Sequence, residues 1–483
     1  MNRTLLATAF LAVSLHAAPP PPAPRPAPAA KYKLAESSAR PLERDDWWSI
    51  FGDPQLDRLI AQVETANFDT QAALARVEQA RAATGIARAE FFPTIRLGQT
   101  TSRARNSATQ RVAGFSGTLR SATINTLSLP VDFGYELDVW GRIRKGVDAA
   151  RADADAAQAV HDTLVLTLRA EVAATWFSLR TLDTQRAILR GTIGLRGEAL
   201  DFAQQRMSGG IGTDFDVARA EAELASAEAE IAGLAQRRPA LENGLAVLVG
   251  TDPSRFRVDA DLAWKQTVKV PAIPPGIPAQ LVSRRPDVAA AESQLAAASA
   301  RIGVARTQFL PTIRLAGQIG LLTGEGDALF DRESRTWSFG ATVSVPLFEG
   351  GRLRYGLDAA HAVHQEAVAR YQQTVLTATA DVETALGALR ALADRIAAQT
   401  RGEAATARGA KFARDRYRAG TSTYLEVIDA ERGALNTQLA TAAISGEQLA
   451  TIVQLIKALG GGWQGGDSRS HPSGRSSERL ITQ

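Results

Sequence analysis

The chain offers few side chains suited to catalysis or metal binding. Of its 483 residues none is cysteine and only five are histidine. His361 and His364 are three residues apart, but no third ligand lies near them in the sequence, so we interpret them as surface residues. Residues 320–326 are glycine-rich but lack the Lys-Ser/Thr of a phosphate loop. No nucleophile–histidine–acid arrangement is present. The sequence therefore indicates a protein that is not an enzyme and needs no cofactor or metal.

Two short glycine-containing segments stand out instead. The first tip (residues 207–213, MSGGIGT) and the second tip (residues 417–422, YRAGTS) each predict a sharp break between two helices, because glycine adopts left-handed backbone conformations easily. A plain connecting turn is one interpretation of both tips. Beyond the second tip, Asp429 and Arg432 are three residues apart on one helix face, where a solvated ion pair within the helix remains an open alternative to a functional role.

These segments belong to a long internal repeat. The second copy repeats the first at an offset of about 218 residues near its start and about 210 further on. A loop between the two blocks is thus shorter in the second copy. The matching segments are Gly85–Arg88 with Gly303–Arg306, Phe91–Leu97 with Phe309–Leu315, Gly141–Arg144 with Gly351–Arg354, and Phe202–Glu221 with Phe412–Glu431.

Each copy predicts a helix, two strands and a long helical pair. No proline occurs between Pro130 and Pro239 or between Pro346 and Pro472, which permits uninterrupted helices. A helix from Arg142 to about Met207 would be about 100 Å long, a length typical of coiled coils.

Apolar and small polar residues alternate in the predicted strands. Residues 337–347 and 127–137 show this period of two, and Ile95–Leu97 and Ile313–Leu315 begin the partner strands. A soluble β-sandwich is an alternative. Four strands of about ten residues cannot close a barrel, however, whereas three chains would supply twelve.

The N-terminus predicts export. Arg3, the apolar run Leu5–Leu15 and the small residues Ala17 and Ala18 form a signal-peptide pattern. No later apolar run of about 18 residues was found, so we expect no transmembrane helix. A helix is expected to begin at Asp53-Pro54 and to continue to Glu90.

The net charge is +4, with 55 basic and 51 acidic residues and no block of five or six like charges, so nucleic acid is not an expected partner. We predict the following division of the chain: a signal peptide at 1–17, a Pro/Ala-rich linker at 18–45, a first repeat at 46–250, a Pro-rich connector at 251–278, a second repeat at 279–460 and a flexible Gly/Ser-rich tail at 461–483.

Several motifs together resemble the TolC-like outer-membrane efflux channels, in particular the NodT/OprM-type outer-membrane factors of RND efflux systems. The resemblance covers most of the mature chain. The motifs are Asp46–Leu56, Arg284–Asp287 with Ile302–Ala305 beyond it, Val345–Arg352, and Tyr417–Arg432.

This resemblance implies an α+β membrane protein that forms a homotrimer. Long antiparallel coiled-coil helices would form a helical barrel, and four strands per protomer would form a 12-stranded transmembrane β-barrel among outer-membrane lipids. It also implies the outer-membrane channel of a tripartite efflux system, a passive duct associated with drug resistance. The duct would receive small molecules from an inner-membrane efflux pump through a periplasmic adaptor protein.

The resemblance also implies roles for residues at the two tips. Tyr417, Leu425, Asp429 and Arg432 match a periplasmic gate, and Gly210, Gly212, Gly420 and Thr421 lie in the tips that would dock the adaptor. In the first copy the positions equivalent to Leu425, Asp429 and Arg432 are Phe215, Arg219 and Ala222. We therefore expect the polarity of the gate to reside mainly in the second hairpin.

Members of this group commonly carry a lipid-modified cysteine after the signal peptide, but here Ala18 follows Leu15-His16-Ala17, so we expect no lipid anchor. The competing function is a soluble periplasmic coiled-coil scaffold or adaptor. The alternating strand at 337–347 argues against it.

Overall fold

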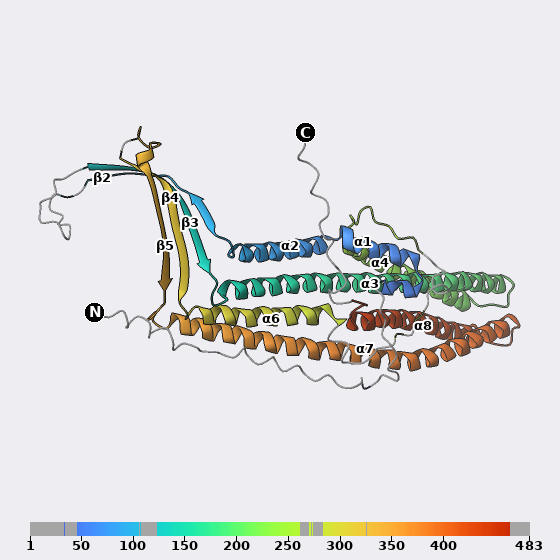
Figure 1. Cartoon of the computed structure of the whole chain (residues 1–483). Coiled ribbons are helices and arrows are strands. Elements are labelled where there is room, and N and C mark those ends of the chain that lie inside the picture. Colours follow the sequence, from blue (N-terminus) through green and yellow to red (C-terminus); the bar gives the residue numbers. More distant parts are fainter. Residues whose placement is uncertain are drawn as a thin grey trace, which may run out of the picture. The chain divides into compact units, whose positions relative to one another are not determined.

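The computed structural model of the chain describes residues 46–105, 123–260, 284–324 and 326–463, together with residues 33, 107, 270, 271 and 273 (Figure 1). The predicted signal peptide, almost all of the linker, most of the connector and the tail after residue 463 lie outside the described residues. The chain divides into two compact units. Residues 88–149 and 295–372 belong to the first, and the other described residues belong to the second.

The first unit contains one antiparallel sheet. Its strands are β1 (Thr94–Leu97), β2 (Thr100–Arg105), β3 (Thr123–Leu137), β4 (Thr312–Thr323) and β5 (Arg335–Ser344), in the order β1-β3-β4-β5. Both β1 and β2 pair with β3 in one continuous register, so they share one strand position. The four strand positions predicted from the repeat are therefore confirmed.

A proline explains the interruption between β1 and β2. The register places Gly98 opposite Pro130, and the Gly98 amide donates to the Pro130 carbonyl at 2.9 Å. Pro130 has no N–H to return a hydrogen bond, so the ladder breaks at this point. In the second copy, β4 and β5 pair without such a break from Thr312↔Ser344 to Leu321↔Arg335.

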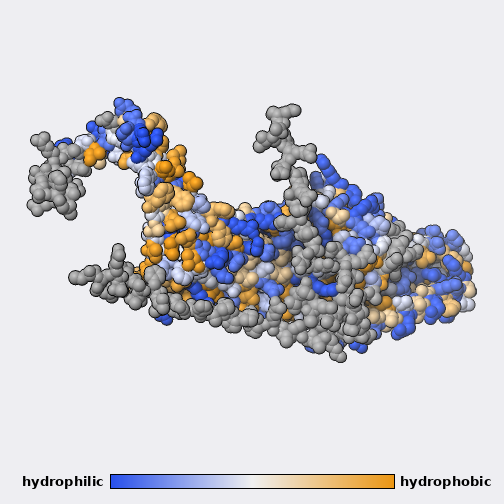
Figure 2. Space-filling view, in the orientation of Figure 1, coloured by the Kyte–Doolittle hydropathy of each residue, from blue (hydrophilic) through white to orange (hydrophobic). Residues whose placement is uncertain are grey.

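The two faces of the sheet differ in chemistry. One face, called the apolar face below, exposes large apolar side chains and forms part of the hydrophobic surface in Figure 2; it includes Ile95, Leu97, Ile319, Trp337, Phe339 and Val343. The other face carries charged and polar side chains. There, Gln318 donates to Asp132 at 3.0 Å, and Arg314 lies 3.4 Å from Glu136.

The strand at the end of the second copy is shorter than predicted. We expected it to run to Leu347, but β5 ends at Ser344. Pro346 follows closely and cannot donate to a strand ladder. Leu347 and Phe348 are nevertheless almost fully exposed, so the apolar side chains continue past the strand.

Two long helical pairs confirm the predicted long helices, although one helix of the first pair continues through Pro239, beyond the proline-free segment. The first pair is α3 (Arg142–Ser208) and α4 (Asp214–Leu248), and the second is α7 (Arg352–Arg418) and α8 (Tyr424–Ala458). In both copies the helices contain 67 and 35 residues. The remaining helix before the sheet in the second copy is α6 (Pro286–Thr307).

The predicted helix from Asp53 to Glu90 is wrong in one respect, because it is two helices. α1 (Pro54–Ala66) and α2 (Phe68–Ala89) are separated by Asn67, whose backbone is extended. The Asn67 side-chain oxygen accepts from the Thr70 amide at 3.0 Å and so caps α2. The predicted start is confirmed, since the Asp53 carboxylate accepts from the amides of Gln55 and Leu56.

The main core of the second unit joins the N-terminal segment to three long helices. The 3-10 helix η1 (Trp47–Phe51) and α1 pack against α3, α4 and α8. Fully buried members include Trp47, Phe51, Trp176 and Phe177. The Trp176 indole N–H donates to Asp53 at 2.8 Å, so the cap of α1 is tied to this core.

Within the part of the chain that the structure describes, one helix meets the length and hydropathy of a membrane span, contrary to the sequence expectation. α8 contains an 18-residue window of mean hydropathy 1.3, and half of that window is buried inside the chain. Leu449, Ile452, Val453 and Ile456 lie in the main core, which accounts for the apolar composition of α8 without a membrane. The first residues of the predicted tail also pack here: Gly461 is buried, and Trp463 donates to Asp162 at 3.0 Å.

Candidate functional site at the hairpin tips

The two tips close by the same backbone geometry. Gly210 and Gly420 adopt left-handed φ angles of 76° and 74°. The amide of Ile211 donates to Arg206 at 3.0 Å, and the amide of Thr421 donates to Arg416 at 2.9 Å. These bonds satisfy carbonyls at the ends of α3 and α7. The helix breaks predicted at both tips are therefore present.

The other two tip residues of the prediction also have structural contacts. Gly212 donates to the Arg206 carbonyl, and a Cβ at this position would lie only 2.7 Å from the Met207 backbone nitrogen. The Thr421 hydroxyl donates to the Arg416 carbonyl at 3.0 Å. Both residues therefore stabilise the backbone of the turns. Their role in docking the adaptor stays a prediction.

Tyr417 lies in an aromatic cluster that joins the two hairpins. Its ring lies 5.7 Å from that of Phe202 on α3 and 5.3 Å from that of Tyr424 on α8, and the Arg206 guanidinium lies over it. Burial raises the pKa of Tyr417, and burial raises the pKa of Tyr424 to about 12. Both phenols are therefore neutral hydrogen-bonding groups at physiological pH.

Arg432 forms its ion pair with the other hairpin rather than with Asp429. Its guanidinium contacts the carboxylate of Glu223 on α4, and this hydrogen bond is the main cause of its raised pKa. Glu223 is 6% exposed and also pairs with Arg196 of α3 at 3.1 Å. Among the residues that the structure describes, Asp429 is exposed and makes no ion pair. The solvated Asp429–Arg432 pair is therefore absent from this conformation.

The expectation that the polarity of the gate resides mainly in the second hairpin stays a prediction, but charged pairs lie near the tips of both hairpins. Glu223 and Arg196 belong to the first hairpin, and sequence reasoning missed both. The position equivalent to Arg432 is Ala222, which is the residue before Glu223. A comparison of equivalent positions therefore does not include Glu223. The burial of Glu223 follows from the packing of the helices, so the alanine-rich sequence of α4 carried no local signal for it.

The remaining tip positions are more exposed. Leu425 is partly exposed, and its equivalent Phe215 lies under the Arg219 guanidinium at 4.7 Å. Deeper in the second hairpin, Arg414 pairs with Glu431 at 3.2 Å. Burial raises the pKa of Glu431, with Arg414 acting in the opposite direction. The two hairpins thus present different side chains on the same backbone.

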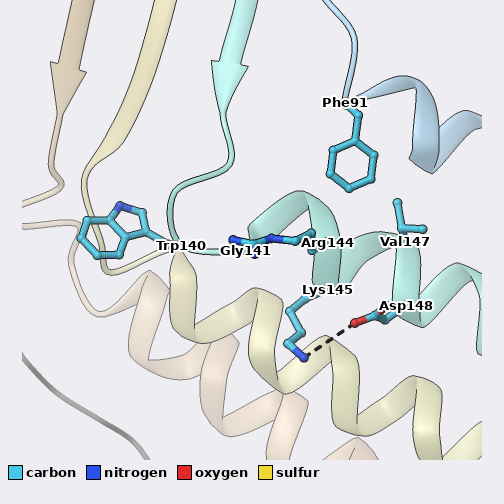
Figure 3. Close-up of a pocket in the computed structure, with 7 residues that line it drawn as sticks. All are labelled: Phe91, Trp140, Gly141, Arg144, Lys145, Val147 and Asp148. Carbon is cyan, nitrogen blue, oxygen red and sulfur yellow. Dashed lines mark ion pairs between the residues drawn. The ribbon is translucent and has the colours of Figure 1, made fainter.

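A separate open pocket of about 410 Å³ lies in the first unit where β3 leads into α3 (Figure 3). It is lined by Phe91, Trp140, Gly141, Arg144, Lys145, Val147 and Asp148. Its cations are already paired, Arg144 with Asp138 at 3.1 Å and Lys145 with Asp148 at 3.7 Å. The Asp138 carboxylate also accepts from the first amides of α3, so the pocket has the features of a helix cap rather than of a ligand site.

Comparisons with known proteins agree with this architecture. The family described as Outer membrane efflux protein matches residues 59–251 and 277–461. The chain is 34% identical to the pyoverdine export outer membrane protein OpmQ of Pseudomonas putida over 433 residues, which covers 89% of this chain and 90% of that protein. It is 34% identical to the outer membrane protein OprJ of Pseudomonas aeruginosa over 454 residues, covering 92% and 91%.

A solved structure gives the same result. The outer-membrane channel OprN superposes with a TM-score of 0.83 at 30% identity, covering 91% of this chain and 97% of that chain. The chain belongs to the Outer membrane efflux protein family and has the TolC-like fold of its trimeric channels, with two repeats and four strands per chain. It is an outer-membrane channel of an efflux system and not an enzyme.

Proposed function

We propose that three copies of this chain form one duct through which small molecules leave the cell. The observation that carries this proposal is the sheet, which has only four strand positions yet exposes Trp337, Phe339 and Val343 on its apolar face. Lipid would cover that face, and the polar face with Asp132 and Glu136 would line water. Three such sheets supply the twelve strands of a barrel wide enough for a pore.

The partners of the duct follow from the family. An inner-membrane pump of the RND type supplies the energy, and a periplasmic adaptor connects the pump to the helical end of the channel. The relatives named for pyoverdine export and for solvent and toluene efflux support a small-molecule cargo. We assign adaptor docking to the tips with Gly210, Gly212, Gly420 and Thr421.

Docking at the tips can be tested by cross-linking. Gly420→Leu places a side chain at a left-handed φ of 74° on an open part of the tip. We expect it to abolish cross-linking to an adaptor while trimers persist, and Gly402→Leu on the open surface of α7 serves as the control. Full cross-linking by the Gly420 variant would refute the docking role.

We further propose that the resting gate is held by Tyr417, Arg432 and Glu223, with Leu425 and Asp429 facing the aperture. The ion pair and the aromatic cluster join the two hairpins of a protomer. A half-exposed pair contributes on the order of 1 kcal/mol, which an adaptor could overcome on binding.

The proposal includes the division of the chain into segments and the removal of its signal peptide. Residues 1–17 would be removed as a signal peptide, residues 18–45 would form a linker, and residues 46–250 and 279–460 would form the two repeats around the connector at 251–278. A flexible tail would follow the packed residues 461–463. Ala18 cannot carry a lipid, so the barrel would hold the protein in the membrane. Mass measurement of the mature N-terminus tests this point, and an acylated peptide would contradict it.

Planar-bilayer recordings test the duct and its gate together. Purified wild-type trimers should show small openings, and Arg432→Ala with Asp429→Ala, or Glu223→Gln alone, should raise mean conductance about fivefold, as expected for loss of a contact of about 1 kcal/mol. Arg395→Gln is the control, because Arg395 pairs with Glu447 at 3.1 Å within the second hairpin, between α7 and α8 and away from the tips. Unchanged conductance in the tip variants would refute the gate, and no conductance at all in any preparation would refute the duct.

A further inference from the structure

The apolar face of the sheet ends in arginines. Arg103 and Arg105 lie on β2, where they pair with Asn125 and Thr123, and Arg335 begins β5, where it pairs with Leu321. Side chains alternate between faces along a strand, so residues an even number of positions apart share a face. Arg103 and Arg105 therefore lie on the face of Leu97, and Arg335 lies on the face of Trp337.

These arginines lie at the end of the sheet that has no connection to an α-helix. The chain enters β1 from α2 and leaves β5 towards α7, so the opposite end, with Arg105 and Arg335, is the one remote from helical connections (Figure 1). In an outer-membrane channel whose helices extend into the periplasm, this remote end faces the outer leaflet. Figure 2 shows hydrophilic residues at this end of the sheet, next to the hydrophobic band.

The charge on this face has one sign. In the described strands, the apolar face carries no acidic side chain, whereas Asp132 and Glu136 lie on the other face with Gln318 and Arg314 as partners. Asp327, Asp331 and Glu333 lie outside the strands, in the segment between β4 and β5. Thr123, Asn125 and Thr323 add hydrogen-bonding groups at the level where the apolar residues end. The surface is therefore an apolar band bordered by cations at its outer edge.

We propose that Arg103, Arg105 and Arg335 bind the phosphate groups of the phosphorylated glycolipid that forms the outer leaflet of the outer membrane. Guanidinium groups match phosphate oxygens through paired hydrogen bonds, and basic clusters at a membrane surface recognise anionic headgroups. Trp337 and Phe339, whose rings lie 6.2 Å apart directly below Arg335, would contact the acyl chains of the same molecule. An amphiphile with both parts fits this surface, whereas free phosphate would use only its edge.

The proposal rests on the outer-membrane location of the chain and is independent of the gate and of the pump. Thermal unfolding of purified trimers in detergent tests it. The probes are bisphosphorylated lipid A, the same lipid without its phosphates, and inorganic pyrophosphate. We expect the bisphosphorylated lipid to raise the melting temperature of the wild-type trimer, and neither of the other probes to do so.

A charge-removal variant locates the effect. Arg103→Gln/Arg105→Gln/Arg335→Gln should bind bisphosphorylated lipid A about tenfold more weakly and lose the increase in melting temperature. Arg96→Gln is the matched control, since the register places Arg96 opposite Asp132, with both side chains on the other face of the same sheet. An equal shift with dephosphorylated lipid, a shift with pyrophosphate alone, or full binding by the triple variant would each overturn the proposal. Native mass spectrometry of bound lipid gives the same comparison if the variant is less stable without ligand.

Discussion

The two helical hairpins have the same backbone and different interiors. Both consist of a 67-residue and a 35-residue helix, joined by a tip with a left-handed glycine. Buried charges are concentrated in the first hairpin, which holds Arg180, Asp183, Arg196 and Glu223. In the second hairpin, α8 buries mainly apolar residues such as Leu449, Ile452, Val453 and Ile456. Helix length and tip geometry are therefore independent of the side chains that stabilise the interior of each hairpin.

The helices end in equivalent ways in the two copies, although the residues differ. Asn67 donates to the Leu248 carbonyl at the end of α4 at 2.9 Å. Arg285 donates to the Ala458 carbonyl at the end of α8 at 3.1 Å. Asn67 and Arg285 are 218 positions apart, and Leu248 and Ala458 are 210 apart, so both partners occupy the equivalent positions of the repeat. A neutral amide thus does in one copy what a guanidinium does in the other.

Replacement of the buried Asp183 should give the largest difference in stability between the two hairpins. Asp183 is fully buried and lies 3.2 Å from Arg180 and 3.0 Å from Arg238. Asp183→Ala would remove the carboxylate that Arg180, Arg186 and Arg238 share, and we expect a loss of about 3–5 kcal/mol of stability. The first hairpin should then unfold at a lower temperature, as measured by thermal denaturation of purified trimers.

The second copy supplies the control for Asp183. Its equivalent position is Ala393, and the neighbouring Asp394 is exposed. Asp394→Ala should change stability by less than about 0.5 kcal/mol. Similar losses for Asp183→Ala and Asp394→Ala would show that buried charge does not distinguish the hairpins.

Replacement of the glycines that follow α4 and α8 should lower stability equally, because the two copies share this helix end. Gly250 and Gly460 are 210 positions apart and have φ angles of 71° and 92°. A Cβ would lie 2.2 Å from the Ala66 carbonyl oxygen at Gly250, and 2.0 Å from that of Arg284 at Gly460. We expect each change to alanine to lower the free energy of unfolding by about 2–4 kcal/mol. Both changes strain the backbone and displace a neighbouring segment of the chain.

Chemical denaturation of the two glycine variants provides the measurement. Gly244→Ala is the control, since it lies inside α4 with nothing within 4 Å of a Cβ, and alanine there should be neutral or stabilising. A large effect at only one of the two positions would mean that the copies do not share this helix end.

The repeat made most of the fold predictable, because length and proline spacing are local properties of the sequence. The long helices, the four strand positions and the glycine tips all followed from it. The break at Asn67 was missed because it depends on a distant carbonyl, that of Leu248. The Glu223–Arg432 pair joins positions 209 residues apart in different copies, so no local spacing could reveal it. Ion pairs across a fold require the packing of the helices, which sequence patterns alone do not give.

The smallest expected effect is a pH dependence confined to the second hairpin. Burial raises the pKa of Glu431 above its ordinary value of 4.5, whereas its equivalent Glu221 is exposed. A folded state with a raised pKa binds the proton more tightly than the unfolded state does, so this contribution to stability is complete below pH 4.5 and is lost as the pH rises through the folded pKa. Glu431→Gln cannot ionise, and its melting temperature should match that of wild type at low pH and exceed it slightly at neutral pH. Glu221→Gln should follow wild type at both pH values. A constant difference between Glu431→Gln and wild type across this pH range would instead trace the effect to the lost ion pair with Arg414, and the buried acid would then be equivalent to its exposed counterpart.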